Sequence, residues 1–110
     1  MKIETTILKN LLQNEDYARK VLPFLNDEYF TENSDKIIYN QINNFILKYN
    51  SLPNKEALNI ELSDAKITEE DFKESINLIN EIGKDDQEFS DLSWLLDSTE
   101  KFCQDKAIYN

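Results

Sequence analysis

The chain has 110 residues and a formal net charge of −10 at pH 7, with one glycine, two prolines, one cysteine and no histidine. Its length suits one domain, and so few glycines and prolines exclude the many tight turns that β-sheets need, so we expect an all-α bundle of about six helices. The absence of histidine excludes the usual zinc and iron ligand sets and the nucleophilic sites built on histidine, and a single glycine excludes a Walker A loop.

The sequence shows no sign of membrane insertion or export. No apolar run approaches the roughly 18 residues of a membrane span, and no basic residues followed by an apolar stretch mark a signal peptide at the start of the chain. We therefore expect a cytoplasmic protein without membrane contact.

The acidic charge is concentrated in the second half. Residues 1–60 hold 8 acidic and 7 basic side chains, whereas residues 61–110 hold 14 acidic and 5 basic ones. Binding to nucleic acid depends on lysine and arginine at the phosphates, so we expect no strong nucleic-acid binding. The acidic half is interpreted either as a solvated surface that aids solubility or as a face that docks a basic partner.

The first quarter of the chain predicts two helices. The first covers residues 2–13 and ends at Asn14, whose side chain can also cap a short second helix. Pro23 should end that second helix because proline lacks a backbone N–H. Phe24 and Leu25 are then expected to turn inward.

The stretch from Asp27 to Leu58 is the one around which the rest should pack. Its middle carries apolar residues at the spacing of one helix face: Ile38, Ile42, Phe45, Ile46 and Tyr49. Three more apolar residues widen that stripe beyond a narrow seam: Ile37, Tyr39 and Leu47. We expect a central helix near residues 35–49 with Phe45 in the core, capped by the polar segment 31–34 and preceded by a turn that carries Tyr29 and Phe30.

Two further helices are predicted after the break at Pro53. Asn54 should cap a helix over residues 55–62. Thr68 begins a capping box for a helix that ends at Gly83, where a left-handed glycine is expected. The acidic connector Asp85, Asp86 and Glu88 lacks the spacing of a calcium loop and is interpreted as a solvated turn.

The last helix should begin after Ser90 or Asp91 and is still periodic at Asn110, so we expect the chain to be a piece of a longer protein. Cys103 lies on its apolar face and is interpreted as core filler. Trp94 lies on its flank, where a large aromatic is either core or an interface anchor, and the sequence leaves both open.

With these elements laid out, the chain resembles the N-terminal domain of the DnaB-family hexameric replicative DNA helicases, in the branch encoded by large tailed phages. The resemblance is most specific over NDEYFTENSDKIIYNQINNFILKYNSLPNKEALNIEL and resumes at SWLLDSTEKFCQDKAIYN. The residues that carry it are packing residues: Asp27, Glu28, Tyr29, Phe30, Tyr39, Ile42, Phe45, Pro53 and Leu58.

The resemblance implies a helical head that is followed, in the family, by a helical hairpin, a linker and a RecA-like motor. Such heads help to hold the hexamer together and contact primase, and a helicase loader is a further possible partner. ATP and magnesium are expected only in the motor, so no catalytic, metal-binding or cofactor-binding residue is assigned here, and Trp94 is the one interface candidate. For a phage-encoded protein, the compartment is the cytoplasm of the host.

Two other functions stay open at this point. The acidic second half is compatible with a free-standing acidic protein that binds other proteins or mimics DNA, which would require carboxylates at regular, phosphate-like spacing along one face. The helicase-binding domain of a primase is the other alternative, because that helical bundle is similar to the head of its helicase partner.

Overall fold

The computed structural model describes residues 2–83 and 91–109, which form six α-helices, two short 3-10 helices and no strand. The elements are α1 (Ile3–Gln13), α2 (Glu15–Val21), η1 (Leu22–Phe24), η2 (Asp27–Tyr29), α3 (Asn33–Tyr49), α4 (Lys55–Asp64), α5 (Glu69–Ile82) and α6 (Leu92–Tyr109). The predicted all-α class is therefore confirmed. No helix in these residues is both long and apolar enough to cross a membrane.

Most helix starts are fixed by the capping side chains that the sequence predicts. The side-chain oxygens of Asn14, Asn54 and Thr68 accept hydrogen bonds from backbone N–H groups three residues on, at 3.0, 2.7 and 3.1 Å. Asp91 does the same for the N–H of Trp94 at 3.1 Å. Each bond satisfies a backbone donor that has no partner within its helix, so these local signals place α2, α4, α5 and α6.

Two predicted details at helix ends are wrong. Glu32 precedes α3 without a side-chain capping bond, so the segment 31–34 does not cap this helix as expected. Gly83 ends α5 but has φ −84° and ψ 0°, outside the left-handed region, which is occupied instead by Asn50 after α3. A Cβ at Gly83 would lie 2.8 Å from the Ile79 carbonyl oxygen, so the lack of space favours glycine there.

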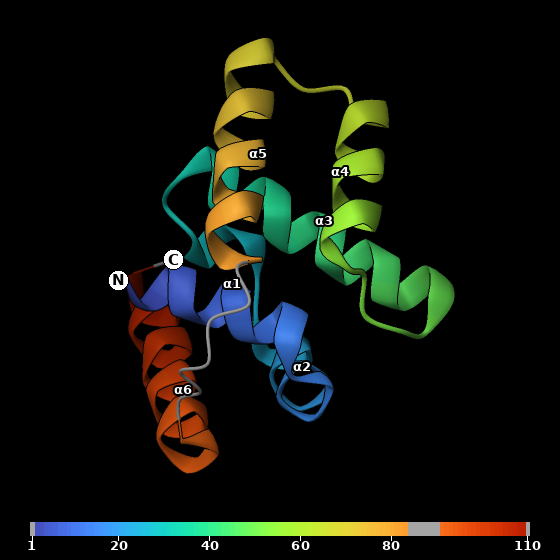
Figure 1. Cartoon of the computed structure of the whole chain (residues 1–110). Coiled ribbons are helices and arrows are strands. Elements are labelled where there is room, and N and C mark those ends of the chain that lie inside the picture. The colour runs from blue at the N-terminus through green and yellow to red at the C-terminus, as the bar shows by residue number, and fades with distance from the viewer. Residues whose placement is uncertain (1, 84–90, 110) are drawn as a thin grey trace.

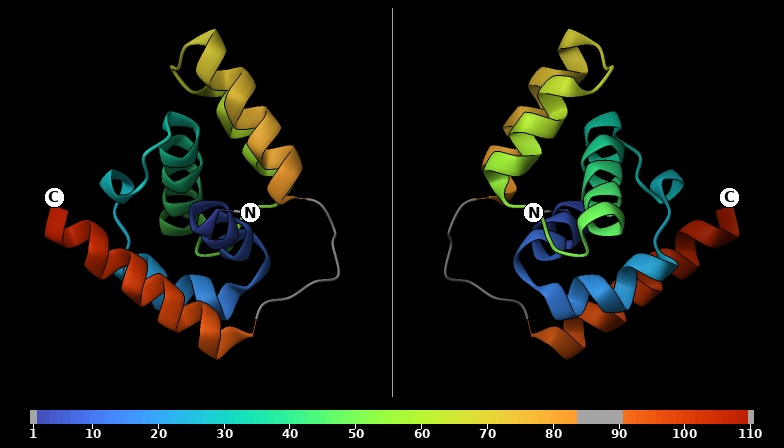
Figure 2. Two further views of the ribbon diagram at one scale, coloured as in Figure 1. Left: turned by 90° about the vertical axis from the view of Figure 1, so that its left-hand side faces the viewer. Right: turned by 90° about the vertical axis from the view of Figure 1, so that its right-hand side faces the viewer.

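Helix α3 lies at the centre of the bundle. It contacts α1, α4, α5 and η2, and the antiparallel pair α4 and α5 stands upright beside it (Figure 1). Helix α6 packs against α2 and η2, and Figure 2 shows it at the opposite end of the molecule from α4 and α5. The molecule therefore has two lobes of helices joined through α1, α2 and α3.

The predicted stripe of α3 forms the core only in its first half. Ile38, Tyr39 and Ile42 are buried, whereas Phe45 is half-buried and lies outside the core, and Leu47 is 76% exposed. The expectation of a core position for Phe45 is thus wrong. The C-terminal end of α3 extends past the other helices (Figure 1). The Phe45 ring packs on Tyr49 with the ring centroids 4.7 Å apart, and both residues line a small pocket with Glu61 of α4.

Replacing Phe30 by alanine should cost about 3–5 kcal/mol of unfolding free energy, because Phe30 is fully buried and its removal leaves a cavity. Phe45→Ala, the matched control, should cost less than about half of that, because water already reaches this side chain. Denaturant melts followed by circular dichroism measure both values. Equal costs for the two variants would contradict this description of the core.

Candidate interaction surface

An aromatic cluster joins α3 to α6 through the segment that carries η2. The Phe30 ring stacks on Tyr39 of α3 with centroids 5.4 Å apart and meets Phe102 of α6 at 5.7 Å. Tyr29 makes an edge contact with Phe102 at 6.5 Å. Such pairs contribute beyond their buried area. Phe30 therefore holds α6 against the central helix, although it belongs to neither.

Polar contacts fix the position of this segment on α3. The Tyr39 hydroxyl donates a hydrogen bond to the carbonyl oxygen of Leu25 at 3.1 Å, and burial raises the pKa of Tyr39. The side-chain amide of Asn40 donates to a carboxylate oxygen of Asp27 at 3.2 Å. Both bonds join the chain before α3 to the body of α3, so the aromatic cluster has a defined geometry.

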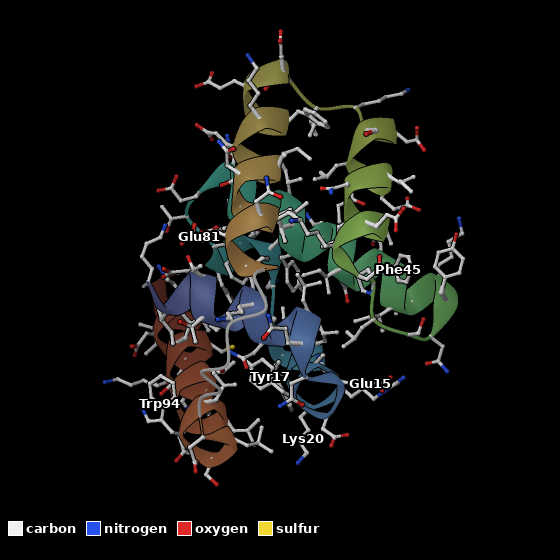
Figure 3. The ribbon with its side chains drawn as sticks, in the orientation of Figure 1. Glu15, Tyr17, Lys20, Phe45, Glu81 and Trp94 are labelled. Atoms are coloured by element: carbon white, nitrogen blue, oxygen red, sulfur yellow. The ribbon has the colours of Figure 1, made fainter. Side chains whose placement is uncertain are left out.

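A second buried contact joins α2 to α6. The Tyr17 hydroxyl lies 2.6 Å from Thr99 Oγ1, and Thr99 donates its own hydroxyl hydrogen to the carbonyl oxygen of Leu95 at 2.7 Å. Tyr17 is therefore the donor to Thr99, and Figure 3 shows it between α2 and α6. Burial raises the pKa of Tyr17 to about 12.

An open, mainly apolar groove of about 560 Å³ runs between α6 and the segment of α2 and η1. Its lining residues are Lys20, Val21, Phe24, Tyr29, Leu96, Thr99, Glu100, Cys103, Gln104 and Ala107. The prediction for the residues after Pro23 is only half right: Leu25 is buried, but Phe24 is 71% exposed at this groove. An aromatic side chain that is both exposed and beside an apolar groove is typical of a contact site for another protein.

One thiol lies in the wall of the groove. Cys103 is half-buried in its wall, and burial raises the pKa of the thiol, so the nucleophilic thiolate is disfavoured. Across residues 2–83 and 91–109, no three or more histidine, cysteine, aspartate or glutamate side chains are grouped to hold a metal ion. The described residues therefore give the groove a mainly apolar surface and no activated thiol.

The structure brings part of the predicted packing residues together. Phe30, Tyr39, Ile42, Pro53 and Leu58 are buried, Asp27 and Tyr29 are half-buried beside Phe30 and α3, Phe45 is half-buried apart from them, and Glu28 is exposed. The acidic connector Asp85, Asp86 and Glu88 lies outside the described residues.

Trp94 does not belong to the core. It is 52% exposed and, in Figure 3, lies on the side of α6 that faces away from α2. The choice between core and surface that the sequence left open is settled for the surface, while its role as an interface anchor stays a prediction. Sequence reasoning missed Phe24 and the groove. The available signal was Pro23, which changes the direction of the chain after α2.

Comparison with known proteins gives one informative match and one negative result. No protein-family model matches the chain. The chain is 32% identical to a DnaB-like replicative helicase of Enterobacteria phage T4 over 104 residues, which is 94% of this chain. The match covers 21% of that helicase, so the chain spans about a fifth of the length of its relative. The resemblance to the phage DnaB-like replicative helicases, predicted from the packing residues, is confirmed.

Replacing Tyr17 by phenylalanine should lower the unfolding free energy by about 1 kcal/mol near neutral pH, because the buried Thr99 oxygen loses its donor. Its pH dependence has a defined sign. A folded pKa of about 12, above the ordinary 10.0, means that the protonated phenol stabilises the fold below pH 10.0 and that this contribution is lost as pH rises toward 12.

Chemical denaturation of the two proteins at several pH values between neutrality and 12 measures this difference. The stability advantage of the native chain over Tyr17→Phe should shrink across the interval from 10.0 to about 12. A constant difference over that interval would show that Tyr17 does not titrate there as the buried hydrogen bond requires.

Proposed function

We propose that this chain is the N-terminal assembly and primase-docking domain of a phage replicative DNA helicase. The observation that carries the proposal is the 32% identity to a DnaB-like replicative helicase over 94% of the chain. In this proposal the longer protein forms a hexamer that unwinds DNA with ATP, and this domain supplies contact surfaces only. ATP and magnesium belong to the motor, and a helicase loader is a further partner.

The geometry supports a contact role. The described residues form a small helical body with an apolar groove between α2 and α6, the exposed Phe24 beside it and the exposed Trp94 elsewhere on α6. Aromatic side chains are enriched at protein interfaces, where they combine large contact area with a low entropic cost. The groove is therefore the first surface to test as the docking site for primase.

The alternatives differ in what lies beyond this chain. A primase helicase-binding domain should follow a catalytic primase domain in the same reading frame. A helicase head should be followed by a reading frame that contains a Walker A motif. The match to a helicase favours the helicase head. The net charge of −10 is the observation that favours a free-standing DNA mimic.

Titration calorimetry of this chain with the primase encoded in the same genome tests the proposal. We expect saturable binding that Phe24→Asp weakens about tenfold or more, because a charge at a buried contact must be desolvated. Leu47→Asp is the matched control, since Leu47 is similarly exposed, at 76% against 71% for Phe24, and is not among the residues that line the groove.

Two results of that experiment would revise the proposal in different ways. An absence of binding at any accessible concentration would contradict the primase-docking role. Equal affinities for Phe24→Asp, Leu47→Asp and the unaltered chain would keep the role but remove the groove from it.

The isolated chain should bind single-stranded DNA negligibly at physiological salt, because its net charge of −10 repels the phosphates. Fluorescence anisotropy of a labelled oligonucleotide measures this directly. Tight, saturable binding would show that the domain contacts DNA itself and would overturn a role limited to protein contacts.

A further inference from the structure

A second pocket, of about 500 Å³, opens where the beginnings of α1 and α3 meet one side of α5. Four carboxylates line it, from Glu32, Asp35, Glu74 and Glu81, while Lys2 is the one cationic side chain among its lining residues. Figure 3 shows Glu81 near the end of α5, above the beginning of α1. The pocket is therefore strongly acidic and lies away from the apolar groove.

Asp35 is the buried carboxylate of this pocket. Its side chain is only 3% exposed, and its Oδ2 atom has no hydrogen-bond partner among the described residues. Lys2 Nζ lies 4.0 Å from that oxygen, too far for a hydrogen bond, on a side chain that is 58% exposed. A buried carboxylate oxygen without a hydrogen-bond donor is costly, and Lys2, the one cationic side chain at the pocket, is not close enough to donate to it.

The side chains around Asp35 add to the excess of negative charge in the pocket. Burial raises the pKa of Asp35, Lys2 opposes that rise, and Glu4, Glu32 and Glu81 add to it. Glu74 faces the same pocket from α5. A single exposed lysine therefore faces a group of carboxylates, and a second positive charge within the pocket would be stabilised.

A guanidinium group fits this chemistry better than a metal ion does. Within the described part of the chain, the carboxylates are not grouped closely enough to hold a metal ion. A guanidinium is planar, carries five N–H donors, and can pair with one carboxylate while its charge is shared with others nearby. We propose that this pocket receives an arginine side chain of a partner protein, which donates hydrogen bonds to the Asp35 carboxylate and displaces Lys2 from it.

The arginine does not come from this same domain in a second copy of the protein. The one arginine of the chain, Arg19, is already engaged: Nη2 donates to Glu15 Oε1 at 2.9 Å and to the Asn50 carbonyl oxygen at 3.1 Å. The inference rests on the proposed docking role for the existence of a partner, but its test does not use primase.

The test is a titration of the isotopically labelled chain with the peptide acetyl-Gly-Arg-Gly-amide, followed by two-dimensional ¹H–¹⁵N NMR at neutral pH and low ionic strength. Saturable shifts are expected at the amides of residues 32–35 and 74–81. The citrulline peptide of the same shape, which lacks the charge, should cause no comparable shifts. Shifts of equal size with both peptides, or shifts spread over the whole acidic surface, would overturn the proposal.

Matched variants place the effect at the pocket. Asp35→Asn should weaken arginine-peptide binding about tenfold, whereas Glu69→Gln, the same charge change at the exposed start of α5, should leave it unchanged. Lys2→Gln should strengthen binding because the competing ammonium is gone. Equal effects of Asp35→Asn and Glu69→Gln would contradict the assignment.

Glu81→Gln provides a second variant for the case that Asp35→Asn perturbs folding, because Glu81 is exposed at the pocket. It should weaken the binding of the arginine peptide as well, and an unchanged affinity would count against the pocket. If the unaltered chain binds the arginine peptide but not primase, the proposed function alone is refuted. If it binds primase but not the arginine peptide, only the proposed arginine site is refuted.

Discussion

One aromatic ring, Phe30, is buried between two helices that are far apart in the sequence. Phe30 stacks on Tyr39 of α3 and contacts Phe102 of α6, and it is fully enclosed by them. Helix α6 otherwise packs mainly on the short helix α2, where the buried Tyr17–Thr99 bond holds the pair. Together these two contacts set the separation of α2 and α6, and that separation is the groove.

The sequence predicted most of the fold because its signals are local. Asn14, Asn54, Thr68 and Asp91 cap helices through bonds that span only three residues, so their roles can be read from spacing. Burial was harder to predict. Phe45 lies on the same predicted stripe as Ile42, but it is only half-buried and packs on Tyr49 of its own helix, and no residue within α3 carries that information.

The candidate sites were less accessible to sequence reasoning for the same reason. The groove combines side chains from α2, η1, η2 and α6, and its walls meet only after tertiary packing. The pocket around Asp35 combines three helices, and the missing donor for its Oδ2 atom has no signature in the sequence. The family resemblance was easier to predict from the sequence than the sites were. The aromatic turn and the residues of the central helix were enough to indicate the resemblance to the helicases, which the comparison confirmed.

Amide hydrogen exchange along α6 in a Phe30→Leu variant measures whether Phe30 holds α6 in place and so shapes the groove. Leucine keeps an apolar side chain but removes the ring contacts with Tyr39 and Phe102. We expect faster exchange throughout α6 and residues 27–30, with the exchange of α4 and α5 unchanged. Unchanged exchange in α6, or an equal increase in every helix, would contradict it.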